Sequence, residues 1–118
     1  MKRLRAVLGC WLLSFSIAGV ASAEEEIRYL LSFIAESDCT FVRNGDEYNA
    51  EQAAQHLRKK YERGRAYVSS AEQFIARIAS ASSWTGMPYR VRCSNETAAS
   101  GDWLRAALGA YRARDLAD

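Results

Sequence analysis

The sequence lacks the motifs by which most catalytic and nucleic-acid-binding proteins are recognised. No Gly-x-Ser-x-Gly elbow surrounds a serine nucleophile, and no glycine-rich loop is present to hold a phosphate. No stacked-aromatic or glycine-rich nucleic-acid motif occurs, and there are no repeats, linkers or low-complexity tracts. We therefore expect the protein to bind neither a cofactor nor nucleic acid.

Long hydrophobic runs are also absent, apart from one short run at the N-terminus. Lys2, Arg3 and Arg5 precede the apolar segment 6–20, and Ala21-Ser22-Ala23 follows it. The segment is short for a membrane span of about 20 residues and ends in small residues, not in a basic stop-transfer flank. We therefore expect a cleavable signal peptide over residues 1–23 and a periplasmic or secreted protein without a stable membrane anchor.

Removing the signal changes the charge balance. The chain has 16 basic and 14 acidic residues, and the signal contains three of the basic ones, which leaves 13 against 14 and a net charge of −1. A nearly neutral mature chain gives no reason to expect nucleic acid or an anionic membrane as partner.

The predicted mature part, residues 24–118, has the size of one small domain. The hydrophobic core of so small a domain gives only marginal stability, so a disulfide would contribute much of the free energy of unfolding. Cys10 lies in the signal, and the two remaining cysteines, Cys39 and Cys93, predict one disulfide in an oxidising compartment. The alternative is two free thiols, whereas two cysteines and one histidine are too few for a closed zinc site.

Apolar spacing predicts four helices, over residues 24–37, 50–63, 71–82 and 101–113. Asn49, Ser70 and Ser100 are the expected N-caps, with Gln52 and Gln73 completing two capping boxes. Gly64 is the expected C′ residue of the second helix.

The strands are predicted by turn chemistry and alternation. Asn44-Gly45 favours a type I′ hairpin over residues 40–48, which pairs Arg43 with Asp46 and Phe41 with Tyr48. Residues 89–93 alternate and predict a further strand, while residues 95–97 are expected to lie in a polar loop. The predicted fold class is α+β: about four helices packed on a small antiparallel sheet, with one disulfide.

Four segments, in this order after a signal peptide, resemble the YfeK-like family of small exported bacterial proteins. They are Ser37-Asp38-Cys39-Thr40-Phe41-Val42-Arg43-Asn44-Gly45, residues 51–61, Ala71-Glu72-Gln73-Phe74-Ile75, and Ser82-Ser83-x-x-Gly86-x-Pro88-Tyr89-x-Val91. The resemblance covers nearly all of the mature chain and implies export and a shared fold. The family has no established activity, so the resemblance implies no catalytic residue.

The candidate binding surface is the hairpin tip together with the polar flank of the second helix. It consists of Arg43, His56, Lys60 and Arg63. The basic run 58–65 is otherwise expected to be a solvated helix face, His56 a hydrogen-bonding surface residue, and Ser82 and Ser83 turn residues.

We expect an exported, non-catalytic binding or interaction module, whose partner is an envelope protein or a small ligand. The rival hypothesis is a small envelope hydrolase that uses His56 with a spatially close serine or carboxylate. A third is a folding factor, which would need an exposed apolar patch. The sequence does not determine the oligomeric state.

Overall fold

The computed structural model describes Gly9 and residues 21–117, so most of the predicted export signal lies outside the described residues. In chain order the elements are α1 (Ala23–Glu36), β1 (Thr40–Arg43), β2 (Asp46–Tyr48), α2 (Ala50–Gly64), α3 (Ala71–Phe74), β3 (Arg90–Cys93), β4 (Glu96–Ala99) and α4 (Ser100–Ala117). A 3₁₀ turn, Arg65–Tyr67, follows α2, and a π-helical segment, Ile75–Ala79, continues α3. Among the described residues, no helix combines the length and apolar character needed to cross a membrane.

The sheet is antiparallel throughout, with the strand order β2-β1-β3-β4. One row of paired residues runs across all four strands: Tyr48, Phe41, Val91 and Ala98. Phe41 and Val91 are buried, whereas on the other face Arg92 pairs with Glu47 at 3.0 Å and both remain exposed. The sheet therefore has one face in the core and one in water.

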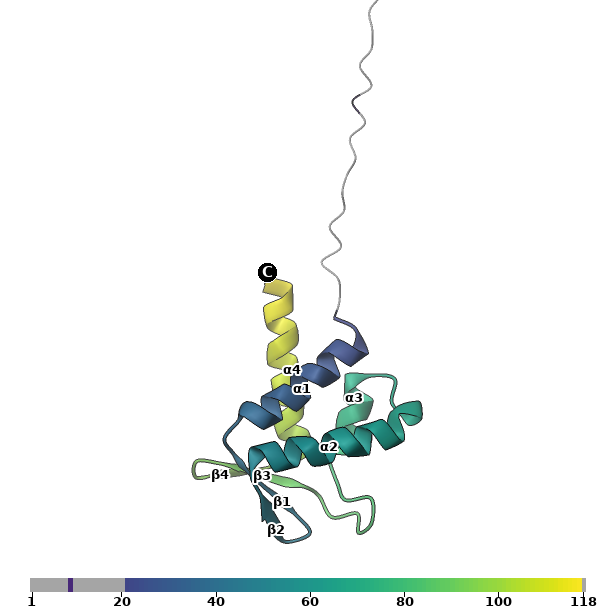
Figure 1. The fold of residues 1–118 in the computed structure, drawn as a ribbon. Helices are drawn as coiled ribbons and strands as arrows, with labels where there is room; N and C mark the ends of the chain where they lie inside the picture. Colours follow the sequence, from purple (N-terminus) through teal and green to yellow (C-terminus); the bar gives the residue numbers. More distant parts are fainter. Residues whose placement is uncertain (1–8, 10–20, 118) are drawn as a thin grey trace, which may run out of the picture.

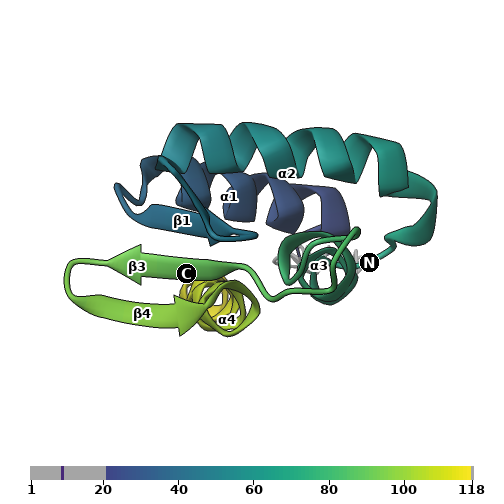
Figure 2. The ribbon, with the colours of Figure 1, turned by 90° about the horizontal axis from the view of Figure 1, so that it is seen from below.

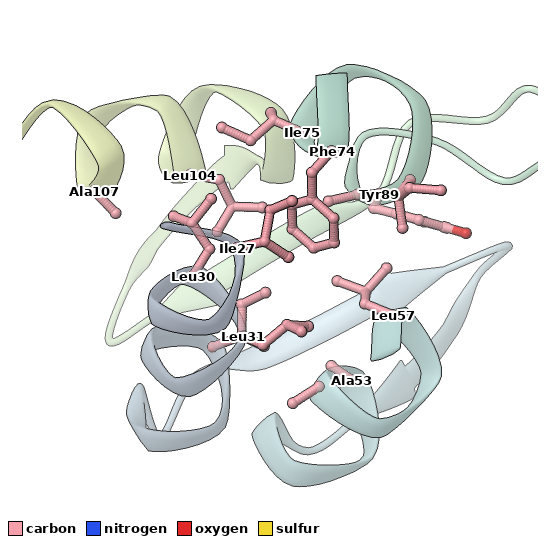
Figure 3. Close-up of a cluster of buried hydrophobic side chains, with 14 of the residues drawn as sticks. Ile27, Leu30, Leu31, Ala53, Leu57, Phe74, Ile75, Tyr89, Leu104 and Ala107 are labelled. Atoms are coloured by element: carbon pink, nitrogen blue, oxygen red, sulfur yellow. The ribbon is translucent and has the colours of Figure 1, made fainter. Parts of the chain in front are cut away.

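The helices cover the buried face of the sheet. Helices α1 and α2 lie side by side next to β1, and α4 lies against β3 and β4 (Figures 1 and 2). Their apolar stripes meet in one core, in which Leu30, Phe74 and Leu104 are wholly buried (Figure 3). The predicted α+β class is confirmed.

Local signals in the sequence determine the hairpin and α2. Asn44 and Gly45 both have positive φ, 51° and 83°, as a type I′ turn requires, and the predicted register is observed. Asn49 caps α2 in a complete capping box with Gln52. The predicted disulfide between Cys39 and Cys93 is present and joins the start of β1 to the end of β3.

Several predicted boundaries are wrong. Gly64 is not a left-handed C′ residue: its φ is −99°, and the chain continues into the 3₁₀ turn. The third helix is α-helical for only four residues and ends at Ala79, because residue 81 already bridges to Pro88. The predicted capping box at Ser70 is only half formed. The Ser70 hydroxyl accepts from the Gln73 N–H, but the Gln73 side chain accepts from the Ser69 N–H and not from the Ser70 N–H.

The predicted polar loop at residues 95–97 is also wrong. Ser94, with a φ of 54°, reverses the chain, and Glu96–Ala99 pairs with β3 as a fourth strand. Helix α4 then begins at Ser100 and runs four residues further than predicted, to Ala117. Backbone pairing with β3 stabilises a segment whose side chains carry little strand preference.

The start of α1 lies at the predicted cleavage junction. Ser22 is the N-cap, and its hydroxyl accepts a hydrogen bond from the Glu25 N–H at 3.2 Å. A chain cleaved before Glu24 would lack this cap. It would keep three acidic residues in the first turn, Glu24, Glu25 and Glu26, where the helix dipole favours negative charge.

We expect the disulfide to dominate the stability of the domain. Replacing both cysteines by alanine should lower the free energy of unfolding by about 4 kcal/mol, because the unfolded chain regains the entropy of a long closed loop. Urea unfolding of the chain 24–118 would measure this. Reduced wild type should unfold at the same urea concentration as the double variant. Equal midpoints for oxidised wild type and the variant would contradict the prediction.

A second stabilising contact joins α1, α3 and α4. The Arg112 guanidinium donates to both carboxylate oxygens of Glu26, at 2.7 and 2.9 Å, and also contacts Glu72. The Glu26 side chain is only 8% exposed, so its charge depends on this pairing.

Replacing Arg112 by Met should leave the Glu26 carboxylate buried without its partner and cost about 1–3 kcal/mol. The matched control is Arg105→Met, which removes only the exposed pair with Asp102 and should cost less than about 0.5 kcal/mol. Thermal or urea unfolding of the two variants tests the difference. Equal losses of stability in the two variants would show that the pairing of Arg112 with Glu26 contributes no more than an exposed ion pair.

Candidate functional site

A groove of about 710 Å³ lies where three segments meet: the hairpin tip, the outward face of α2 and the turn between the π-helical segment and β3. We call it the basic groove, because its lining within residues 21–117 contains five cationic residues and no carboxylate. The five are Arg43, Lys59, Lys60, Arg63 and Arg77.

The periodicity of α2 places four polar residues on the groove. His56, Lys59, Lys60 and Arg63 occur at i, i+3, i+4 and i+7, which is one face of an α-helix. Over seven residues they extend about 10 Å along the helix. Tyr61 belongs to the opposite, buried face, so the same helix supplies core and groove.

Arg43 is held by neutral partners. One of its guanidinium nitrogens lies 2.9 Å from both ring nitrogens of His56, and the other donates to the Tyr48 hydroxyl at 3.0 Å. The expected charge pairing with Asp46 does not form: the two are opposite in the hairpin register, yet no ion pair joins them. The inward turn of Arg43 is therefore explained by Tyr48 and His56.

Lys60 is likewise held without a carboxylate. Its ammonium donates to the Ala81 carbonyl at 2.8 Å and to the Tyr89 hydroxyl at 3.2 Å, and it lies 5.0 Å from the centre of the Tyr89 ring. None of the five groove cations forms an ion pair within the described part of the chain. Their positive charge is not neutralised by an acid, and that of Arg43 and Lys60 is also held in position by neutral partners.

These surroundings lower the pKa of His56. Burial is the main cause, followed by the positive charges of Arg43, Lys60 and Arg63. A guanidinium has only donors, so the ring nitrogen that accepts from Arg43 must carry a lone pair. His56 is thus a neutral imidazole enclosed by cations. Burial also lowers the pKa of Lys60 and raises the pKa of the Tyr89 hydroxyl.

The hairpin tip is joined to the turn that forms the far wall of the groove. The Asn44 amide donates to the Ser82 hydroxyl at 3.3 Å and accepts from the Thr85 hydroxyl at 2.7 Å. Ser82 also accepts from the N–H groups of Trp84 and Thr85, at 3.3 and 3.4 Å, which confirms it as a turn residue. The Trp84 side chain, 97% exposed, lines the groove from this turn.

All four residues of the predicted surface, Arg43, His56, Lys60 and Arg63, line the basic groove. Arg43 contacts His56, and Lys60 and His56 both contact the Tyr89 hydroxyl. No hydrogen bond of the Arg63 side chain is observed among the described residues. Sequence reasoning missed Tyr48, Tyr89, Arg77 and Trp84. It did note Lys59 in the basic run, and the helical spacing with His56 and Arg63 could have placed it on this face.

The contacts of His56 are those of a structural residue. Its hydroxyl neighbour is Tyr89, with Nε2 at 3.4 Å from the phenol oxygen, and no hydrogen bond joins it to a serine or carboxylate within the described residues. Ser82 and Ser83 line the same groove, but the Ser82 hydroxyl is occupied as an acceptor. No group of three or more potential metal ligands gathers in residues 21–117.

Comparison with known proteins places the chain in a family. Residues 21–112 match a family of unknown function, DUF5329. The chain belongs to this family. It is also 42% identical over 92 residues to a protein of Salmonella typhimurium described as "Uncharacterized protein YfeK". The aligned region covers 75% of this chain and 77% of that protein. No solved structure matches significantly. The YfeK-like resemblance is confirmed, and the function of the family is unknown.

The lowered pKa of His56 predicts a pH-dependent stability. In the unfolded chain histidine titrates near pH 6.5, and in the folded protein it titrates lower. Between the two values the unfolded state binds more protons, so the contribution of His56 is complete above about pH 6.5 and is lost as the pH falls below it.

Urea unfolding at pH 7.5 and 5.5 would test this, with His56→Gln as the variant that cannot titrate. The wild type should lose more stability on acidification than the variant. Equal losses of stability in both proteins would show that the pKa of His56 is not lowered in the folded state.

Proposed function

We propose that this protein is an exported, non-catalytic binding module of the bacterial envelope, and that the basic groove holds an anionic group of its ligand. The observation that carries the proposal is the groove itself: five cationic side chains line it with no carboxylate among them. Uncompensated charges of one sign in a concave site concentrate the field and attract ligands of opposite sign.

The partners of the cations support binding. A tyrosine hydroxyl, a neutral imidazole and a backbone carbonyl orient Arg43 and Lys60 without cancelling their charge. A cationic donor is bound more strongly by an ionised acceptor than by a neutral one, because two opposite full charges also attract each other. An incoming oxyanion would therefore gain more from these donors than their present partners do.

The location follows from the sequence. The basic, apolar and small-residue regions of segment 1–23 support export to the periplasm or the outside. In that compartment the ligand is an envelope protein or a small molecule. Among the described residues no hydrogen bond joins His56 to a serine or carboxylate, as the rival hydrolase would need, so binding is the function that the geometry supports best.

The folding-factor hypothesis receives little support from the surface. The exposed large apolar residues among those described are Tyr67, Trp84, Met87 and Leu116. Only Trp84 and Met87 share a segment, and recognition of unfolded chains calls for a contiguous apolar patch of several hundred Å².

The test is titration of the chain 24–118 with inorganic phosphate, pyrophosphate and tripolyphosphate, monitored by calorimetry and by tryptophan fluorescence of the Trp103→Phe variant, in which Trp84 is the remaining tryptophan. Affinity should rise with the charge of the probe and fall with added salt. The double variant Lys59→Gln/Arg63→Gln should weaken pyrophosphate binding by about tenfold or more, because each lost charge-assisted hydrogen bond costs about 1.5–3 kcal/mol.

The matched control is Arg90→Gln/Arg92→Gln, which removes the same charge from the exposed face of the sheet. This control should bind pyrophosphate as the wild type does. Equal weakening in both double variants would mean that the whole-molecule charge and not the groove attracts the anion. Absence of binding to all three probes would overturn the proposal.

A further inference from the structure

A second, smaller cavity adjoins the basic groove. It measures about 30 Å³ and lies between the sheet and α2, with Phe41, Ala53 and Leu57 among its walls. Three residues, Arg43, His56 and Tyr89, line both the cavity and the groove. They therefore form a shared wall, with the cavity on one side and the cationic surface on the other.

The two sides of this wall differ in chemistry. Phe41, Ala53 and Leu57 are buried side chains of the core, so the cavity side of the wall is apolar. Figure 3 shows Ala53 and Leu57 directed from α2 into the buried cluster, and the Tyr89 hydroxyl pointing out of it. An apolar group that enters such a pocket gains contacts without displacing well-bound water.

The wall between the two spaces is held by contacts that an anion can replace. The Arg43 guanidinium bridges the His56 ring and the Tyr48 hydroxyl, both neutral acceptors. An oxyanion in the groove competes for these donors with stronger hydrogen bonds. Arg43 lines both spaces, so a turn of its side chain toward the anion would widen the passage between the groove and the apolar cavity.

We propose that the site binds an anionic amphiphile: a phosphate or carboxylate group lies in the basic groove, and a short alkyl substituent enters the apolar cavity. This inference rests on the proposed anion-binding function and names the class of its ligand. The cavity exceeds the roughly 10–15 Å³ that one water molecule needs, which suits a few carbon atoms and not the acyl chain of a lipid.

The experiment compares inorganic, methyl, butyl and octyl phosphate by calorimetry on the chain 24–118, at constant ionic strength and below the micelle concentration of the octyl ester. Each methylene that becomes buried should tighten binding by about fourfold. Butyl phosphate should therefore bind at least about tenfold more tightly than inorganic phosphate, and octyl phosphate should gain nothing further.

Ala53→Leu fills the cavity from α2 and should abolish the alkyl gain, so that butyl and inorganic phosphate bind with equal affinity. Ala106→Leu makes the same change at an exposed position of α4 and should retain the full gain. Ala53→Val is the smaller replacement if the leucine variant does not fold, and it should reduce the gain.

The outcomes separate the two proposals. Equal binding of inorganic and butyl phosphate by the wild type would overturn the amphiphile inference and leave anion binding in place. Binding of none of the four probes would overturn both. The affinity could also rise steadily up to octyl phosphate and be unchanged by Ala53→Leu. That result would indicate a lipid ligand or non-specific binding of alkyl chains to the protein surface, and it would also overturn the inference.

Discussion

The antiparallel pairing of β1 with β3 is the interaction on which the rest of this structure depends. It places Phe41 opposite Val91, 50 residues later in the chain, and the Cys39–Cys93 disulfide closes the same pair of strands at one end. At the other end the last printed pair is Val42 with Arg90, and the next residues outward, Arg43 and Tyr89, both line the basic groove. Helix α2 packs beside β1 and adds His56 and Lys60 to that corner, so the basic groove is a consequence of strand pairing.

The distribution of charge gives this corner its chemical character. The predicted mature chain has a net charge of −1, yet five cations line one groove without a carboxylate. Like charges gathered in this way repel one another and oppose folding, and after burial they are the second cause of the lowered pKa of His56. A protein that needed only stability would place acids among them, as Glu26 and Glu72 are placed around Arg112. The absence of such acids from the described lining of the groove is why we propose a binding role for it.

Much of the fold could be predicted because its signals are local. Asn44-Gly45 specifies the hairpin through positive φ, and Asn49 with Gln52 specifies the start of α2 through two reciprocal hydrogen bonds. The errors lie where tertiary contacts override local preference. Residues 96–99 have weak strand character and become β4 because β3 offers them a free edge. The helix after Ser70 changes to π-helical geometry and stops early, since residue 81 pairs with Pro88.

The sequence by itself determined the fold class, the disulfide, the hairpin register and the identity of four groove residues. Each of these follows from patterns within a few residues of one another, or from the small number of cysteines. Only the tertiary structure decided that Arg43 turns from Asp46 to His56 and Tyr48, and that Tyr89 holds Lys60. It also decided that an apolar cavity lies behind them. The contacts of Arg43 with His56 and of Lys60 with Tyr89 join residues 13 and 29 positions apart, and their geometry depends on strand pairing and helix packing that no local pattern encodes.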